Sequence, residues 1–310
     1  MAQLGPDWWL SPHRTRGSAA PVYSDICSTA RESRNGRLSK LKLQLLISTM
    51  CQNDSELIKR MNVNSAAVVI NQGSDESVRE ISAGPNKVTW INSTDRGLSK
   101  SRNHAIRHAT ADICLLADDD EVFANNCESI ILEQFSRNPE YDIIVFQVEG
   151  IEKKFKDYYP KERSLGFLYS MKVSSVEIAF RLNRIKEKGI KFNELFGAGA
   201  KYSAGEENIF LFDCLRRGMK IKYVPVKIAD LHIGDSTWFK GYTEKYFIDK
   251  GAIFTAMSKS CSKLLILQFA LRKYKLYADS MTFREVTHLM FKGRREYLSV
   301  KDCKNQLYSK

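Results

Sequence analysis

Four acidic residues occupy positions 118–121, directly after the apolar run 113–117. That run predicts a buried strand, and side chains alternate along an extended chain, so Asp118 and Asp120 point one way and Asp119 the other. Such a pair can hold Mg²⁺ or Mn²⁺, because these hard cations prefer carboxylate oxygens together with substrate phosphates. The alternative is a solvent-exposed acidic turn that caps the next helix.

Arg102 stands out on the helix expected over residues 97–108. Leu98, Ala105 and Ala109 form an apolar stripe on this helix, and Arg102 lies within the stripe. An arginine is unusual there unless it meets an anion, and its planar fork suits a diphosphate. The alternative is an ion pair with one of the acids at 118–120.

Glu206 and Glu207 open the helix expected at about 205–217. Glu207 lies on the apolar stripe with Phe210 and Leu211, and Glu206 lies to one side. A carboxylate beside apolar groups has a raised pKa, which suits a general base. Alternatively, both acids only stabilise the positive end of the helix dipole.

The remaining metal-binding residue types are sparse. His232 lies at the end of a predicted strand, just before the small polar residues 234–236, and a lone histidine of this kind is usually structural. The seven cysteines are odd in number and lack the CxxC spacing, which argues against a zinc module and against a disulfide framework.

The elements that position these residues alternate between strands and helices. The expected strands are 41–48, 66–70, 88–91, 113–117, 141–148, 176–182, 221–226 and 228–233, and the expected helices are 54–62, 97–108, 125–137 and 205–217. This alternation predicts an α/β fold with a mainly parallel central sheet flanked by helices. Ligands bind beyond the carboxyl ends of such strands, where the polar residues should converge.

Charge divides the chain into parts. The net charge is +12, and residues 236–310 contribute 15 Lys/Arg against 6 Asp/Glu, hence +9. We expect this region to be a basic, amphipathic, helical C-terminal extension that meets an anionic partner, or else a set of solvated helix faces. Residues 1–38 resemble a disordered leader or an added segment. No apolar run could span a bilayer, so we expect a cytoplasmic protein, or one peripheral to the inner membrane face.

The ordered motifs over residues 41–235 resemble those of glycosyltransferase family 2, which has the GT-A fold. The resemblance rests on the strand ending at Ser48-Thr49, on Gly97-Leu-Ser-Lys-Ser-Arg-Asn103, which is similar to G-x-S-x-A-R-N, on Asp118–Asp120 as a DxD-like motif, and on Gly205-Glu-Glu207. It implies a catalytic domain over 39–235, with a nucleotide-binding half at 39–125 and an acceptor half at 126–235. The chain departs from the family at Asn71-Gln72, where an acid is usual, and at Glu207, where Asp is commoner.

The resemblance also implies roles. The nucleotide sugar would be bound by Ser48, Thr49, Asn71, Gln72, Gly97, Ser99, Arg102, Asn103, Asp118 and Asp119. Mn²⁺ or Mg²⁺ would be held by Asp120, Asp118 and His232, and the catalytic acids would be Glu207 and Glu206.

The activity implied is an inverting transfer of a sugar from a nucleoside-diphosphate sugar, with UDP rather than GDP, to a glycan or lipid-linked hydroxyl. Surface polysaccharide or glycoconjugate synthesis would be its setting, and an anionic membrane surface would be a partner of residues 236–310. One rival is a metal-dependent nucleotidyltransferase, although no triphosphate loop is visible. The other is a non-enzymatic basic protein that binds a membrane or, with less support, nucleic acid.

Overall fold

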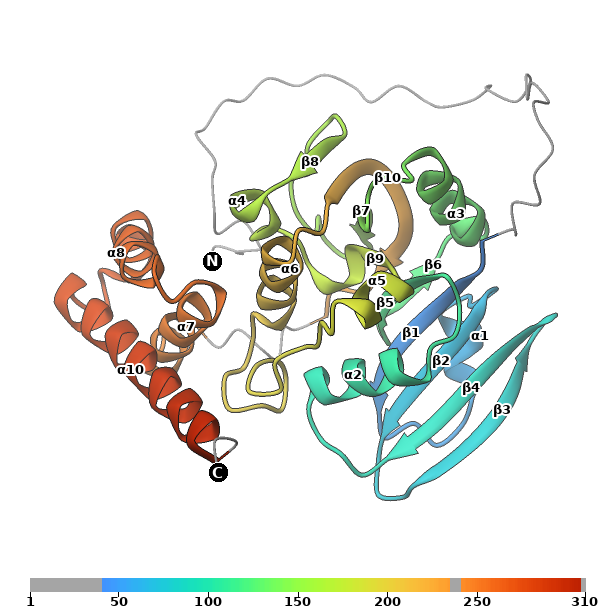
Figure 1. Ribbon diagram of the computed structural model, residues 1–310, viewed down its shortest axis with the longest axis horizontal. Coiled ribbons are helices and arrows are strands. Elements are labelled where there is room, and N and C mark those ends of the chain that lie inside the picture. Colours follow the sequence, from blue (N-terminus) through green and yellow to red (C-terminus); the bar gives the residue numbers. More distant parts are fainter. Residues whose placement is uncertain (1–40, 235–240, 308–310) are drawn as a thin grey trace.

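A computed structural model describes residues 41–234 and 241–307 (Figure 1). The expectation for residues 1–38 lies outside the described residues. The strands are β1 (Leu43–Met50), β2 (Ala66–Gln72), β3 (Ser77–Ala83), β4 (Asn86–Ser93), β5 (Ile113–Asp118), β6 (Glu121–Phe123), β7 (Ile143–Gly150), β8 (Arg163–Leu165), β9 (Ile178–Arg181) and β10 (Ile221–Leu231). They form one sheet in the order β3-β4-β2-β1-β5-β9-β7-β10-β6, with β8 also paired to β10.

The centre of the sheet is parallel. Strand β1 pairs in parallel with β2 and with β5, and β2 pairs in parallel with β4. Antiparallel strands flank this centre, because β3 pairs with β4 and β9 lies between β5 and β7. The predicted α/β fold with a largely parallel centre is therefore confirmed, with a mixed arrangement toward both edges.

Helices cover the sheet and extend beyond it. They are α1 (Glu56–Arg60), α2 (Leu98–His108), α3 (Cys127–Arg137), α4 (Phe167–Ser170), α5 (Leu182–Glu187), α6 (Glu206–Arg216), α7 (Glu244–Met257), α8 (Ser262–Arg272), α9 (Tyr274–Tyr277), α10 (Phe283–Leu307) and the 3₁₀ turn η1 (Ser175–Glu177).

Alternation along β1 separates two hydrophobic cores. Leu45 and Ile47 face a core that contains residues of α1 and α3, whereas Leu46 faces a core that contains residues of α2 and α6. Because both faces of the central strands are buried, those strands read as continuous apolar runs rather than alternating ones.

The C-terminal helices α7, α8 and α10 share a third core with residues of α6 (Figure 1). Helices α7 and α10 meet at glycines, since a Cβ on Gly251 would lie 1.8 Å from the Met290 carbonyl oxygen and one on Gly293 1.8 Å from that of Ile248. Within the described ranges, no helix combines the length and the apolar character needed to cross a bilayer.

Two short strands expected at 221–226 and 228–233 are in fact one strand, β10. The register against β7 shifts between Tyr223 and Lys227 and again before Ala229. Pro225 lies in the first shifted stretch and has no N–H to donate to a neighbouring strand. A bulge accommodates it, so the strand continues where the sequence predicted a break.

Candidate active site

The acidic cluster begins at the carboxyl end of β5. Asp118 is the last residue of that strand, and its backbone N–H donates to Glu121 Oε1 at 2.7 Å. Thr49, near the end of the adjacent β1, donates through Oγ1 to Asp119 Oδ2 at 2.5 Å. Parallel pairing of β1 and β5 thus brings a hydroxyl and the acids to the same edge of the sheet.

Arg102 joins the acidic cluster to helix α6. Its Nη2 donates to Asp118 Oδ1 and Oδ2 at 3.0 and 3.2 Å, and its Nη1 donates to Glu206 Oε1 at 2.9 Å. The guanidinium is buried, and burial opposes its charge, but the two carboxylates outweigh that effect and raise its pKa. The ion pair with a cluster acid, which the sequence left open as the alternative for Arg102, is what the structure shows.

Glycine makes the entry to α6 possible. Gly205 has φ +88°, and a Cβ there would lie 2.8 Å from Ile253 Cγ2 on α7. Only glycine adopts this backbone conformation without strain at such a close approach. The chain therefore turns sharply at Gly205, so that Glu206 and Glu207 form the first turn of α6.

The two glutamates differ in their surroundings. Glu206 is buried and forms an ion pair with Arg102, whereas Glu207 is only partly buried. Burial, and then the charge of Glu206, raise the pKa of Glu207 to about 8, against the effects of Arg102 and Lys250. A carboxyl with this pKa is well matched to proton transfer near neutral pH.

Lys250 of α7 is a functional candidate that the motif search missed. It is buried and lines the same cavity as Glu206 and Glu207. Burial lowers its pKa to about 8, against the effects of Glu207, Asp249 and Glu206. Phe247, Lys250, Phe254 and Met257 recur at helical spacing, so the stripe argument used for Arg102 could have found it.

One cavity of about 260 Å³ unites these groups. Its charged lining consists of Arg102, Asp118, Asp120, Lys172, Glu206, Glu207 and Lys250. Apolar and small residues, among them Leu98 and Val176, form the remaining walls. The structure thus brings residues of both predicted halves and of the C-terminal helices to a single site.

Ser48, Asn71 and Gln72, which were also predicted to bind the nucleotide, do not line this cavity, and their side chains connect neighbouring elements. Ser48 Oγ accepts from Ser101 Oγ at 2.8 Å, and Gln72 Oε1 accepts from the Gly97 N–H at 2.7 Å. The amide of Asn71 bonds the Asn92 side chain and the backbone of residue 52.

Ser99 and Asn103 fasten α2 to the segment that precedes α6. Ser99 Oγ donates to the Phe196 carbonyl oxygen at 2.7 Å, and Asn103 exchanges hydrogen bonds with the backbone of Phe192. These bonds hold the 192–197 segment against α2, which helps to place Gly205 and the glutamates beside Arg102.

The acidic cluster has some, but not all, of the features of a site for a divalent cation. Burial, and then the charge of Asp118, raise the pKa of Asp120 to about 6, so both carboxylates are unfavourable when ionised together without a cation. His232 donates its backbone N–H to the Asp120 carbonyl oxygen, but its exposed ring bonds Glu152 Oε1 through Nδ1 at 2.9 Å. Among the described residues, no group of three or more His, Cys, Asp or Glu is gathered for a metal. Two carboxylates completed by substrate phosphate fit Mg²⁺ or Mn²⁺ better than an all-protein site does.

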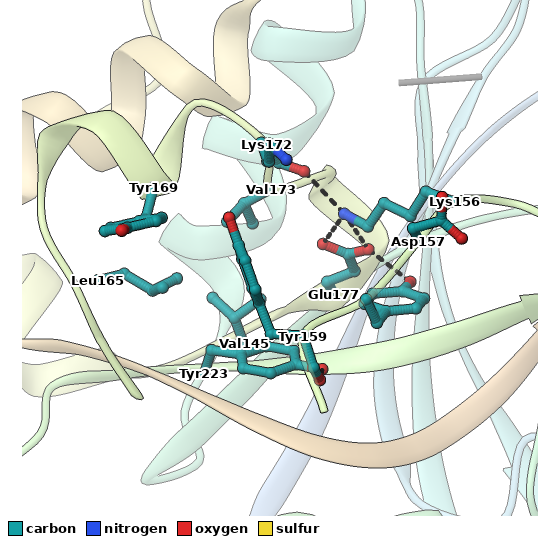
Figure 2. A pocket seen from close by; sticks show the side chains of 11 residues that line it. Val145, Lys156, Asp157, Tyr159, Leu165, Tyr169, Lys172, Val173, Glu177 and Tyr223 are labelled. Carbon is teal, nitrogen blue, oxygen red and sulfur yellow. Dashed lines mark hydrogen bonds and ion pairs between the residues drawn. The ribbon is translucent and has the colours of Figure 1, made fainter. Parts of the chain in front are cut away.

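A smaller cavity of about 30 Å³ adjoins the site (Figure 2). Lys172 and Val173 line both cavities. In the smaller one, Lys156 Nζ bonds the Lys172 carbonyl oxygen and Glu177 Oε2, each at 2.7 Å. This buried ion pair fixes the segment that forms one wall of the larger cavity.

Comparison with known proteins identifies a family and a fold. Residues 57–208 match the family model described as glycosyl transferase family 2. The crystal structure of S. aureus TarS 1-349 aligns with a TM-score of 0.54 at 11% identity, covering 86% of this chain and 92% of that chain. The same TarS fragment in complex with UDP-GlcNAc aligns with a TM-score of 0.54 at 13% identity and the same coverage.

A mannosyltransferase from Pyrobaculum calidifontis, in complex with GDP-Man and Mn²⁺, aligns with a TM-score of 0.47 at 12% identity, covering 84% of this chain and 88% of that chain. No curated protein matches the sequence. The alignments with TarS show that the chain has the same fold.

Proposed function

The chain belongs to glycosyltransferase family 2, and we propose that it moves a sugar from a nucleoside-diphosphate sugar to an acceptor hydroxyl with inversion at the anomeric carbon. One observation carries the proposal: Glu207 shares a cavity with Asp118 and Asp120. A base for the acceptor and a site for the diphosphate therefore line the same cavity, as a single displacement requires.

The diphosphate end of the donor is proposed to lie against Asp118, Asp120 and Arg102. When bound, Mn²⁺ or Mg²⁺ held by Asp120 and Asp118 would stabilise negative charge on the leaving diphosphate. His232 is the third proposed ligand, through its Nε2. The Arg102 guanidinium already donates a hydrogen bond to Asp118, and the phosphates of the nucleotide sugar would offer it further oxygen acceptors.

Glu207 is the proposed general base. As the acceptor oxygen forms its bond to the anomeric carbon, the bond from that carbon to the diphosphate oxygen breaks, and the hydroxyl proton passes to the Glu207 carboxylate. The electron pair of the broken bond leaves with the diphosphate. Lys250, on the same cavity, favours the ionised form of Glu207 that this step needs.

Glu206, grouped at first with the catalytic acids, is proposed as a positioning residue. Its carboxylate is committed to Arg102 at 2.9 Å and is buried. Through that bond it orients the Arg102 guanidinium, which also donates to Asp118. Arg102 thus connects the first turn of α6 to the end of β5.

We propose a UDP-sugar as the donor and a glycan or lipid-linked acceptor, in surface polysaccharide or glycoconjugate synthesis. UDP is the first choice because TarS, which has the same fold, is described in complex with UDP-GlcNAc. The polar ends of β1 and β2, including Thr49 and Asn71, are the proposed surroundings of the nucleoside.

Thermal unfolding with UDP, GDP and CMP, each with and without Mn²⁺, tests the proposal. A ligand at about 100 times its Kd adds about 2.7 kcal/mol of stability, which is measurable. We expect a shift with UDP that requires Mn²⁺ and is lost in Asp120→Ala. Asp213→Ala, at an exposed ion pair with Arg216, is the matched control and should keep the shift. No shift with any nucleotide in the wild-type protein would contradict the proposal.

A further inference from the structure

Helix α8 has two apolar faces. One face is buried in the core of the C-terminal helices through Ile266, Phe269 and Ala270. The other is exposed: Leu264 and Leu271 are 68% and 65% accessible, and Leu267 and Tyr274 are exposed beside them. A folded surface rarely presents several large apolar side chains together unless another surface covers them.

The spacing of the exposed residues makes them one stripe. Leu264, Leu267 and Leu271 stand at i, i+3 and i+7, which places them on one side of the helix. Tyr274 follows at i+10, at the start of α9. The stripe therefore lies along the helix and is not a scatter of single exposed residues.

Along the chain, the charged residues on and next to the stripe are all basic. Between Asp249 and Asp279 the sequence contains no Asp or Glu. Apart from the buried Lys250, its basic residues are Lys259, Lys263, Arg272, Lys273 and Lys275. Lys259, Lys263 and Lys275 are exposed. A stripe of leucines with an aromatic residue, bordered by cations and free of acids, has the chemistry of a helix that lies in the interface of an anionic membrane.

We propose that the exposed face of α8, continued by Tyr274, docks the protein on an anionic lipid surface. The leucines would enter the boundary between headgroups and acyl chains, and the lysines would meet the lipid phosphates. The opposite face remains packed on α7 and α10, so docking requires no unfolding. This inference goes beyond the proposed sugar transfer and does not depend on it.

Vesicle flotation of the full chain tests the proposal. One set of vesicles contains phosphatidylcholine alone, and the other contains phosphatidylcholine mixed with phosphatidylglycerol. We expect binding to the mixed vesicles that weakens as salt is added, because exposed charges are screened. Absence of binding to the mixed vesicles at low ionic strength would overturn the proposal.

Point variants locate the surface. Leu264→Gln, Leu267→Gln and Leu271→Gln combined should lower the vesicle partition coefficient by about tenfold or more, since each leucine loses apolar contact. Glutamine keeps a helix propensity close to that of leucine, so circular dichroism and the unfolding temperature should stay near wild type. The single change Leu271→Gln has a matched control in Val78→Gln, because Val78 on β3 is also 65% exposed. Unchanged binding in the triple variant would overturn the assignment to α8.

The charges give a second, independent arm. Replacing Lys259, Lys263 and Lys275 by glutamine should weaken binding to the mixed vesicles by about fivefold per lysine. A second copy of the chain is the competing occupant of the stripe. Light scattering would reveal it: a dimer that the triple leucine variant converts to a monomer, with vesicle binding unaltered, would refute the lipid surface.

Discussion

Glu207→Gln keeps the size of the side chain and one hydrogen-bonding oxygen but removes its charge. If Glu207 takes the acceptor's proton, the variant loses the general base while the donor site at Asp118 and Asp120 is untouched. General bases contribute about 10²–10⁴ in rate, so kcat should fall by at least about 100-fold. The KM for the donor and the increase in unfolding temperature that the donor causes should both stay within about twofold of the wild-type values, because the change lies on the acceptor side.

The same substitution has a calculable effect on stability. The pKa of Glu207 is about 8 in the folded chain, against an ordinary value of 4.5. Because the folded chain holds this proton more tightly than the unfolded chain, the stability that it contributes falls as the pH rises from about 4.5 to about 8. At about pH 9 the ionised carboxyl costs at most about 5 kcal/mol, and contact of the partly exposed side chain with solvent reduces this to roughly half.

Glu207→Gln should therefore match the wild type in stability near pH 5 and exceed it by about 2 kcal/mol near pH 9. Scanning calorimetry at both pH values, together with steady-state transfer kinetics, makes the measurement. A variant that is inactive but no more stable than the wild type at high pH would show that ionisation of Glu207 does not destabilise the folded protein.

Glu206→Gln is the matched control, one residue away on the same helix. Its carboxylate neutralises the buried Arg102, so its loss should destabilise the protein by about 2 kcal/mol or more at both of these pH values. Transfer by the folded fraction should fall less than in Glu207→Gln. Transfer by Glu207→Gln within about tenfold of wild type, or loss of its donor-induced shift, would refute the assignment of the base.

Two further predictions concern Lys250 and Gly205. The kcat/KM for transfer should rise with pH as Glu207 loses its proton and should level off above about pH 8. Lys250→Met should move this rise to higher pH, because the lysine lowers the pKa of Glu207, and an unchanged pH profile would count against this coupling. Gly205→Ala should destabilise the protein more in the wild-type background than in the Ile253→Ala background, because the new Cβ would lie 2.8 Å from that isoleucine. Urea unfolding of the four proteins in a double-mutant cycle measures this, and additive effects of the two substitutions would contradict the contact.

The centre of the fold was predictable because its signals are local. The run before Asp118 is a buried strand that pairs in parallel with β1, and apolar runs that end in polar residues mark such strands. The helix at 97–108 was predicted nearly to its observed bounds, Leu98–His108. Arg102 was found through its place on an apolar stripe, which is also a local signal.

The edges of the fold were less predictable because they depend on pairing partners. Strand β3 has an exposed Val78 at its start and lacks the alternation expected of a half-buried strand, so only its register against β4 defines it. Strand β9 was expected at 176–182, but its antiparallel insertion between β5 and β7 is a long-range choice. The short β8 and α4 lie between the strands expected at 141–148 and 176–182, where the sequence predicted no regular element.

The site shows the same limit. The sequence offered a cluster acid as a partner of Arg102, but not Glu206, which is 104 positions away in the chain. Lys250 was missed although it satisfies the stripe argument, because the motifs that directed attention end before residue 236. A buried lysine differs from a surface lysine only through what packs around it.

That packing also bears on how catalysis and membrane docking could be separated. Helix α7 supplies Lys250 to the cavity, its Ile253 packs on Gly205, and its Asp249 accepts from Ser203 just before α6. Removing the C-terminal helices would therefore open one wall of the cavity and expose the core that α6 shares with them. A truncation would abolish transfer whether or not those helices bind lipid. The exposed leucines of α8 do not line the cavity, so substitutions there change the docking face while leaving the wall of the active site in place.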